Sequence, residues 1–364
     1  MEMSVKYGCI IYDGRLRLLS KRLSKMRKQI MKTATKQKSR TPNHPTTQPP
    51  DYPTTQLFDY STMRLFSSVI KLTNQHPATL TYLGGQHAHA AFLDVVRAVD
   101  ESLSQRLHDL NGRKPFTVSP LMGLPKTFNH KGHPSPEFRT GSIHEGKEQG
   151  IRLREGWECW LRVTMLDDGL FRSFIEYFMN FPSSTGRGVR GEGKHPQIRL
   201  GDAHFLVSEI LTTPGSHPWA GYISIEELQK RLDEPAPAKF VFELHTPTSF
   251  RLQDKEIATK PTPKLVFGNL AGAWRALTGE NNVEAVEKYA DANLVMRNSK
   301  LRPDRLVLHN NPQLGSVGRV EFIRADKTDH PTARALNLLA DLAFYSGLGR
   351  KTAQGMGMVR RLVV

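Results

Sequence analysis

The chain has 364 residues, and its 51 Lys and Arg against 35 Asp and Glu give a net charge of +16. This excess indicates a polyanionic partner, either nucleic acid or, less often, an anionic membrane surface. Two cysteines, Cys9 and Cys159, argue against a disulfide framework and favour a reducing, cytoplasmic location, and no membrane-spanning apolar run or signal-peptide core is found.

Half of the net charge lies in residues 1–62, which hold 12 Lys and Arg against 4 Asp and Glu. A Pro-, Thr- and Gln-rich run over 41–56 cannot bury enough apolar surface to offset chain entropy, so we predict a disordered basic leader. The leader either adds non-specific RNA affinity or is a gene-model extension upstream of a natural start at Met63. We favour the second interpretation because a clean strand begins directly after Met63; N-terminal sequencing of the native protein decides between them.

From Met63 onward, predicted strands and helices alternate. Residues 64–72 alternate apolar and polar side chains as a half-buried strand does, and helical spacing of apolar residues predicts a helix over 88–99. Asp100 is a suitable cap for a second helical turn through Leu107. The following elements are strands over 115–118 and 157–166, a helix over 170–181 and a strand pair within 198–211. This order of strand, helix, strand, strand, helix and strand is the ferredoxin-like unit.

The second half repeats this outline less clearly. Its predicted helices cover 265–277, with Trp274 in the core, 283–296, and a segment from Pro331 to Tyr345. Its predicted strands cover 239–244, 306–309 paired with 318–323, and 358–363. We therefore predict an α+β fold of tandem ferredoxin-like (RRM-like) domains over 63–213 and 214–364, with a Gly- and Pro-rich linker near Pro214.

The last eighteen residues carry the most informative motif of the chain. Two Gly-apolar-Gly triplets, 347–349 and 355–357, bracket five residues that include Arg350 and Lys351. Glycine tolerates positive φ, and successive exposed N–H groups with two cations make a phosphate site. A Walker loop requires a Gly-Lys step, whereas Lys351 follows Arg350 here. A dinucleotide-binding fingerprint requires a strand before the glycines and a helix after them, and here a predicted helix precedes the glycines and a strand follows them. A glycine-rich turn with incidental charge is the alternative.

This pattern resembles the glycine-rich signature of the RAMP (repeat-associated mysterious protein) superfamily of CRISPR systems, which carry it at the C-terminus. The resemblance implies an RNA-binding loop, whose candidate residues are Gly347, Gly349, Arg350, Lys351, Gly355 and Gly357. A second basic, glycine-rich loop contributes Arg187, Arg190 and Lys194, for which a solvated loop is an equally good interpretation.

Among 14 histidines, His108 is the candidate for catalysis. It ends a predicted helical turn, and the Gly112 turn brings Lys114 toward the same place. On spacing alone, a helix-terminal histidine and a strand-edge lysine are the simpler interpretation. His87 and His89 open the first helix, where a surface position is the simpler interpretation and a role near RNA the alternative. The remaining candidates, His130, His133 and His144, lie in a polar stretch without the partners of a zinc site.

A wider resemblance favours a catalytic role. Leu107-His108, Gly112, Lys114 and the segment 116–119 resemble, in order, the catalytic stretch of CRISPR-associated precursor-RNA processing endoribonucleases. The resemblance implies His108 and Lys114 as catalytic residues, CRISPR repeat RNA as substrate, and no cofactor or metal. It also implies cleavage by 2′-hydroxyl attack, with 2′,3′-cyclic phosphate and 5′-hydroxyl products. Some family members have a tyrosine fifteen positions before the histidine, where this chain has Leu93.

Two other functions stay open at this point. A non-cleaving RAMP scaffold in a CRISPR effector complex is the main alternative, although a scaffold does not need a neutral-pH proton shuttle such as His108. A ribosome- or DNA-associated basic protein explains the charge and leaves the terminal glycine motif unexplained. Other effector subunits, or a second copy of the chain, are further candidate partners, whereas a membrane is not.

Overall fold

The computed structural model describes residues 63–80, 85–124, 151–180, 196–252, 254, 256–280 and 284–363. The predicted leader over 1–62 lies outside these residues, as do Arg187, Arg190, Lys194 and the histidines of the 126–150 stretch. Within the described segments, no helix is both long and apolar enough to cross a membrane.

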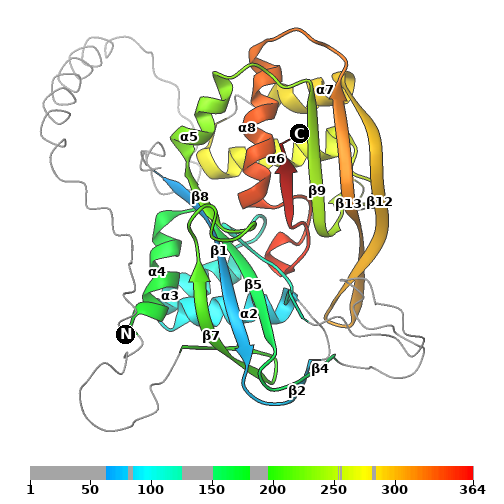
Figure 1. The fold of residues 1–364 in the computed structure, drawn as a ribbon. Coiled ribbons are helices and arrows are strands. Elements are labelled where there is room, and N and C mark those ends of the chain that lie inside the picture. Colours follow the sequence, from blue (N-terminus) through cyan, green and yellow to red (C-terminus); the bar gives the residue numbers. More distant parts are fainter. Residues whose placement is uncertain are drawn as a thin grey trace, which may run out of the picture. The chain divides into compact units, whose positions relative to one another are not determined.

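The first half folds as a ferredoxin-like unit (Figure 1). Its main elements are β1 (Arg64–Asn74), α2 (Gly85–Arg97), α3 (Glu101–Asp109), β3 (Phe116–Val118), β5 (Glu158–Met165), α4 (Asp168–Met179) and β7 (Ala203–Leu211). The strands pair antiparallel in the order β3-β5-β1-β7. The first and third strands of the unit therefore lie at the centre, and the predicted element order is confirmed.

Four shorter strands extend this unit. β2 (Ala78–Leu80) pairs with β4 (Ile151–Leu153), and β6 (Gln197–Leu200) pairs with β7. β8 (Gly221–Ser224) pairs with β1, with Ser224 opposite Arg64. The chain therefore returns to the first sheet after Pro214, and only then enters α5 (Ile225–Gln229) and the short helix η2 (Lys230–Leu232).

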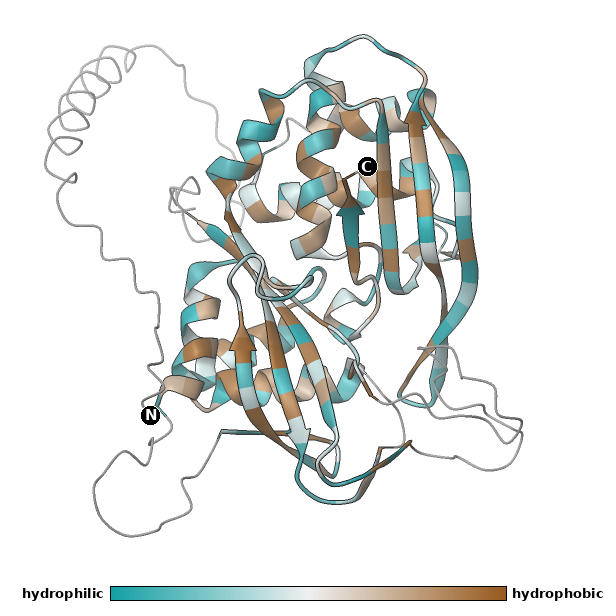
Figure 2. Ribbon diagram, in the orientation of Figure 1, coloured by the Kyte–Doolittle hydropathy of each residue, from teal (hydrophilic) through white to brown (hydrophobic). Residues whose placement is uncertain are grey.

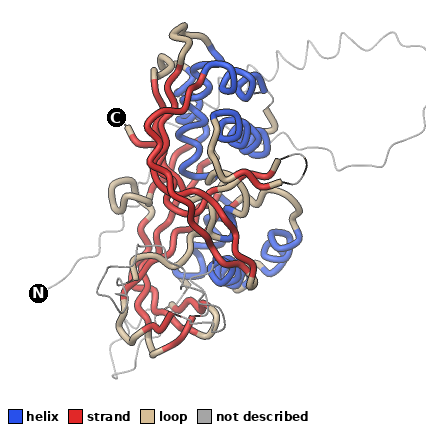
Figure 3. Tube along the Cα trace, turned by 90° about the vertical axis from the view of Figure 1, so that its right-hand side faces the viewer, coloured by secondary structure: helices blue, strands red, loops and turns tan. Residues whose placement is uncertain are grey.

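The second half repeats the topology. Its main elements are β9 (Lys239–Thr248), α6 (Pro263–Thr278), α7 (Glu284–Asn293), β12 (Leu294–Leu308), β13 (Asn311–Arg324), α8 (Pro331–Ser346) and β14 (Val359–Leu362), with β10 (Phe250–Arg251) paired to β11 (Ile257–Ala258). The sheet order β12-β13-β9-β14 corresponds strand by strand to that of the first half. Figure 3 shows helices on one face of the sheets, which confirms the prediction of tandem ferredoxin-like folds.

Three predicted elements of this half, one helix and two strands, are wrong in extent. The helix predicted over 283–296 ends at Asn293, and residues 294–296 begin β12. The strands predicted over 306–309 and 318–323 belong to a longer hairpin, in which Leu306 pairs with Gln313, and Gly318 with Leu301. β12 is an edge strand whose middle is polar and exposed, so its apolar alternation is weak. β13 instead alternates buried positions with exposed or partly buried ones. Figure 2 shows its hydropathy changing in bands along the strand.

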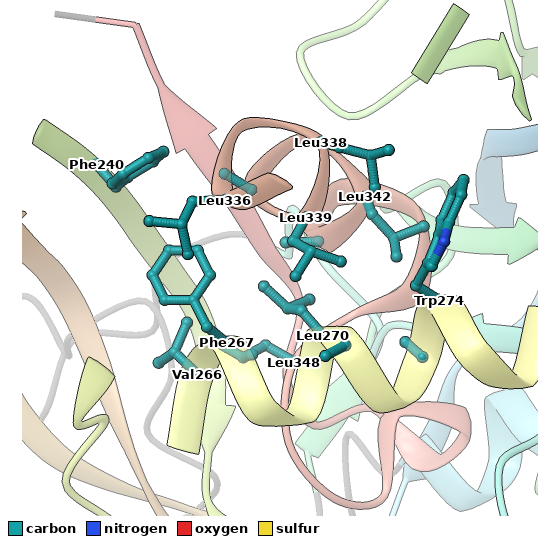
Figure 4. Close-up of a cluster of buried hydrophobic side chains, with 14 of the residues drawn as sticks. Phe240, Val266, Phe267, Leu270, Trp274, Leu336, Leu338, Leu339, Leu342 and Leu348 are labelled. Carbon is teal, nitrogen blue, oxygen red and sulfur yellow. The ribbon is translucent and has the colours of Figure 1, made fainter. Parts of the chain in front are cut away.

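The core of the second half lies between its sheet, α6 and α8 (Figure 4). Trp274 is 1% exposed, and its indole N–H donates to Glu280, so the prediction of a core tryptophan is confirmed. Leu348, between the first two glycines of the C-terminal motif, is fully buried in this cluster. The glycine motif is thereby anchored to the second core by its apolar residue.

A buried arginine joins the two halves. The Arg162 guanidinium, on β5, donates to Ser67 Oγ (2.8 Å) of the first sheet and to the Phe344 carbonyl oxygen on α8. It also lies over the Phe344 ring, 4.4 Å from the centroid. Burial lowers the pKa of Arg162 to about 9. Since these bonds link β5 to both β1 and α8, they hold the second half against the first sheet.

Candidate functional site

His108 lies in the last turn of α3, the short helix after α2. The predicted cap is confirmed, because the Asp100 carboxylate accepts from the Leu103 N–H at 2.8 Å. At the other end of α3, the His108 side chain is 67% exposed, and its Nδ1 lies 2.9 Å from Asp109 Oδ1. The imidazole is therefore accessible to a large ligand and is oriented by a neighbouring carboxylate.

Lys114 lies beside His108, as the Gly112 turn predicts. Gly112 has φ 99°, and the chain after it folds back onto α3. The Lys114 ammonium donates to the carbonyl oxygens of Leu107 (2.6 Å) and His108 (2.8 Å). These carbonyls have no helical partner, so the ammonium caps the helix C-terminus. Burial lowers the pKa of Lys114, and the Asp109 carboxylate opposes that shift.

The C-terminal glycine motif forms a tight loop around the short helix η3 (Thr352–Gln354). Gly347, Gly349, Gly355 and Gly357 all have φ between 65° and 97°. A Cβ on Gly349 would lie 2.3 Å from the Ser249 carbonyl oxygen, and a Cβ on Gly357 2.0 Å from that of Leu348. Both the left-handed backbone and the close approach therefore require glycine.

The backbone amides of this loop are largely used within the protein. The N–H groups of Leu348 and Arg350 donate to the carbonyl oxygens of Gly357 and Ser249, both at 2.9 Å, and Gly349 donates to Asn269 Oδ1 at 2.9 Å. The expectation of successive exposed N–H groups is wrong at these positions, because the amides bond to the loop itself, to α6 and to Ser249 between β9 and β10. These three amides are therefore not available to a ligand.

Two half-buried cations project from the loop. Arg350 donates to Gln313 Oε1 at 2.9 Å. Burial lowers the pKa of Arg350, and the nearby Arg251 guanidinium lowers it further. Burial likewise lowers the pKa of Lys351, with Arg350 adding to the effect. Arg350 therefore lies close enough to Arg251 and to Lys351 for their like charges to repel, an arrangement that a bound anion would relieve.

The loop rests on the N-terminus of α2 in the first half. A Cβ on Gly85 would lie 1.7 Å from the Gln354 carbonyl oxygen, so the two backbones are in direct contact. His89, one turn further along α2, has Nδ1 2.8 Å from the Ala353 carbonyl oxygen. Its ring also stacks on Phe116, with centroids 5.4 Å apart. Residues from both halves thus meet at the start of α2.

His89 interacts with both predicted parts of the site, the glycine loop and the 108–114 segment. Burial lowers the pKa of His89, and the hydrogen bond to Ala353 raises it by a smaller amount. The charges of Lys114, His108 and His309 lower it further. His309 lies in the turn of the β12–β13 hairpin, where its N–H donates to Gln86 on α2. The glycine loop and Phe116 therefore contact His89, and the charges of the 108–114 segment act on it, although its sequence context favours a surface position.

Several histidines lie near the start of α2, but they do not form a metal-binding cluster. Within the segments that the structure describes, no group of three or more His, Cys, Asp or Glu side chains is arranged to hold a metal ion.

Comparison with known proteins gives two family matches. Residues 64–230 match the CRISPR Cas6 N-terminal domain, and residues 242–359 match the CRISPR-associated endoribonuclease Cas6. The chain belongs to the Cas6 family of CRISPR-associated endoribonucleases. His108 and Lys114 lie within the first Cas6 match, and the glycine motif, 347–357, within the second. The resemblance seen in the sequence is confirmed as a RAMP-type family.

Several solved Cas6 structures have the same fold. A product complex of Cas6 (TTHB231) is 26% identical and has a TM-score of 0.62, covering 83% of this chain and 100% of that one. Cas6 (TTHB231) of Thermus thermophilus is 24% identical, with a TM-score of 0.58 over 83% of this chain and 99% of that one. A product complex of Cas6 (TTHA0078) is 22% identical, with a TM-score of 0.56 over 83% and 100%. No curated protein matches the chain.

Proposed function

We propose that this protein cleaves precursor CRISPR transcripts within their repeats to release guide RNAs. Membership of the Cas6 family supports the nuclease class. The observation that carries the residue assignment is the meeting of the 108–114 segment and the glycine loop around His89 at the start of α2. In this proposal the first domain carries the catalytic residues and the second domain carries the RNA-binding loop.

The proposed chemistry needs no metal. The RNA 2′-hydroxyl attacks the adjacent phosphate, which yields a 2′,3′-cyclic phosphate and a 5′-hydroxyl. His108 transfers a proton during this step, because an imidazole can both accept and donate a proton. Lys114, held against the end of α3 by two carbonyl oxygens, supplies positive charge beside the phosphate as its negative charge grows.

RNA binding is assigned to side chains around the glycine loop. Arg350 and Lys351 contact phosphates, whereas the four glycines shape the loop that presents these cations. Arg187, Arg190 and Lys194 are proposed as a second set, in a segment that lies outside the described residues. Other effector subunits, or a second copy of the chain, are further proposed partners.

The experiment is a cleavage assay with the full chain and its own repeat RNA. We expect discrete cuts in excess EDTA, products with cyclic phosphate ends, and no cut when the scissile nucleotide is 2′-deoxy. His108→Ala should retain RNA binding and lose about 10²–10⁴-fold in rate. His204→Ala is the matched control, since His204 is an exposed histidine on β7. A gel shift without any cleavage by the wild-type protein would show a scaffold instead of an enzyme.

A further inference from the structure

The α3–β3 turn, residues 111–114, is held in place by its side chains. Among the described residues, no hydrogen bond involves the backbone N–H or C=O groups of this turn. Lys114 binds carbonyl oxygens at the end of α3, within the same half of the protein. Arg113 bonds to the other half, because its Nη2 donates to the backbone carbonyl oxygen of Asn269, on α6, at 3.1 Å. Arg113 therefore ties the α3–β3 turn to the second half.

Asn269 also binds the glycine loop. Its side-chain Oδ1 accepts from the Gly349 N–H at 2.9 Å, while its backbone carbonyl oxygen, which has two lone pairs, takes the bond from Arg113. The neighbouring residues Leu270 and Leu348 are fully buried in one core cluster (Figure 4), so α6 and this part of the loop are fixed relative to each other. One residue of α6 thus connects the α3–β3 turn with the glycine loop.

The surroundings of Arg113 do not favour stability. In the part of the chain that the structure describes, no carboxylate pairs with its guanidinium, and Nη1 is buried without a hydrogen-bond partner. Burial lowers the pKa of Arg113, and no described acid opposes this shift. A partly buried cation and an unused buried donor both destabilise a fold, and an apolar side chain of similar length would avoid both effects. An arginine retained despite these penalties indicates a role in the reaction.

We propose that Arg113 is a positioning residue for RNA cleavage, which fixes the distance between the α3–β3 turn and the glycine loop. This role rests on the proposed function. The loop holds the RNA, and the turn carries Lys114 beside His108. The bond from Arg113 to Asn269 therefore determines where the scissile phosphate lies relative to both catalytic side chains, and Arg113 itself does not contact the RNA. A misplacement of about 1 Å between reacting groups lowers a rate by about 10²-fold.

The first test removes the guanidinium and retains an unbranched apolar side chain. For Arg113→Met we expect the midpoint of urea unfolding to be unchanged or higher, because the unpaired cation is gone. Affinity for an RNA with a 2′-deoxy scissile nucleotide should be unchanged, and the single-turnover rate at saturating protein should fall about 10- to 10²-fold. Arg172→Met is the matched control, since Arg172 is an exposed arginine on α4, and its rate should equal that of the wild type.

Three results would overturn this assignment. Cleavage by Arg113→Met at the wild-type rate would show that the bond to Asn269 is not needed. A lower urea midpoint, with a rate loss that matches the fraction of unfolded protein, would show a structural role instead. A salt slope of RNA binding that is lower by about one would show that Arg113 contacts a phosphate directly.

The second test asks whether Arg113 and Asn269 act through one connection. Arg113→Lys retains a donor for the same carbonyl oxygen and should recover part of the rate, with a different reach. Asn269→Ala removes the acceptor of the Gly349 N–H and leaves the carbonyl that Arg113 binds, so we expect a rate loss of similar size. Because either change breaks the same connection, the double variant should lose less than the product of the two single losses. Losses that multiply would contradict a shared connection.

The wild-type protein separates this role from the proposed function. If the wild-type protein does not cut its repeat RNA, the proposed function fails, and the role of Arg113 fails with it. If the wild-type protein cuts the RNA and Arg113→Met cuts it equally fast, only the role of Arg113 fails.

Discussion

Gly85 and Gln354 are packed backbone to backbone: a Cβ on Gly85 would lie 1.7 Å from the Gln354 carbonyl oxygen. Gly85→Ala should therefore push the glycine loop off α2, destabilise the protein by about 1–3 kcal/mol and reduce RNA cleavage. Gly272→Ala is the matched control, because it lies in helix α6 with no atom near the added Cβ and should stabilise by up to about 1 kcal/mol. Urea unfolding and a cleavage assay measure both. Equal stability of the two variants would contradict the close contact.

Lys114 has a structural and a chemical role that two substitutions can separate. Lys114→Met retains the apolar stem and removes the ammonium that binds the Leu107 and His108 carbonyl oxygens. We expect a loss of about 1 kcal/mol in the free energy of unfolding, from the missing helix-end interaction, and a larger fall in kcat than rise in KM.

Lys114→Arg should recover the stability and part of the rate, since guanidinium retains the charge with a different hydrogen-bond geometry. A Lys114→Met protein that cleaves RNA at the wild-type rate would remove Lys114 from the catalytic set.

Arg350 and Lys351 should determine how steeply RNA binding depends on salt. Each cation that neutralises a phosphate releases counterions, so Arg350→Gln or Lys351→Gln should lower the salt slope by about one. Lys230→Gln is the control, because Lys230 is an exposed lysine paired with Glu226 at 3.3 Å on α5–η2. Filter binding across a salt series gives the slopes. An unchanged slope in both loop variants, or an equal loss in the control, would argue against phosphate contacts at the loop.

Stability should fall on mild acidification because three histidines have lowered pKa values. Burial is the main cause for His87, His89 and His217. Below the ordinary value of 6.5, the unfolded chain binds more protons than the folded one, so the free energy of unfolding decreases as the pH drops through and below that value. At His217, the charges of Lys71, Arg162 and Arg360 add to the effect of burial. Its Nδ1 also accepts from the Trp219 backbone N–H at 3.1 Å, a hydrogen bond that is lost once Nδ1 is protonated.

Urea unfolding between about pH 7.5 and about pH 5.5 tests this dependence, in a range where most carboxylates stay ionised. His217→Asn should flatten the curve relative to wild type, because it removes one of the protonation sites. A wild-type free energy of unfolding that is constant or rises as the pH falls over this range would contradict the role of these histidines.

Local patterns were enough to predict much of the fold. The Asp100 cap, the start of α8 at Pro331 and the burial of Trp274 all follow from short-range preferences for capping, for proline at the first turn and for apolar spacing. The order of elements then indicated tandem ferredoxin-like units. Prediction is weaker where an element depends on its neighbours. β12 is a strand because β13 pairs with it, and its exposed, charged middle shows little alternation of apolar and polar side chains.

The candidate functional site likewise has features that local sequence predicts and features that depend on tertiary contacts. Residue types and their spacing already indicate the available groups: His108 and Lys114 near one turn, and a cationic glycine motif at the other end of the chain. Tertiary structure alone decided that the glycine amides bond inward and that His89 meets Ala353, 264 residues away. The pKa of a histidine depends on burial, neighbouring charge and hydrogen-bond partners, and at His89 these partners are brought together only when both halves pack at the start of α2.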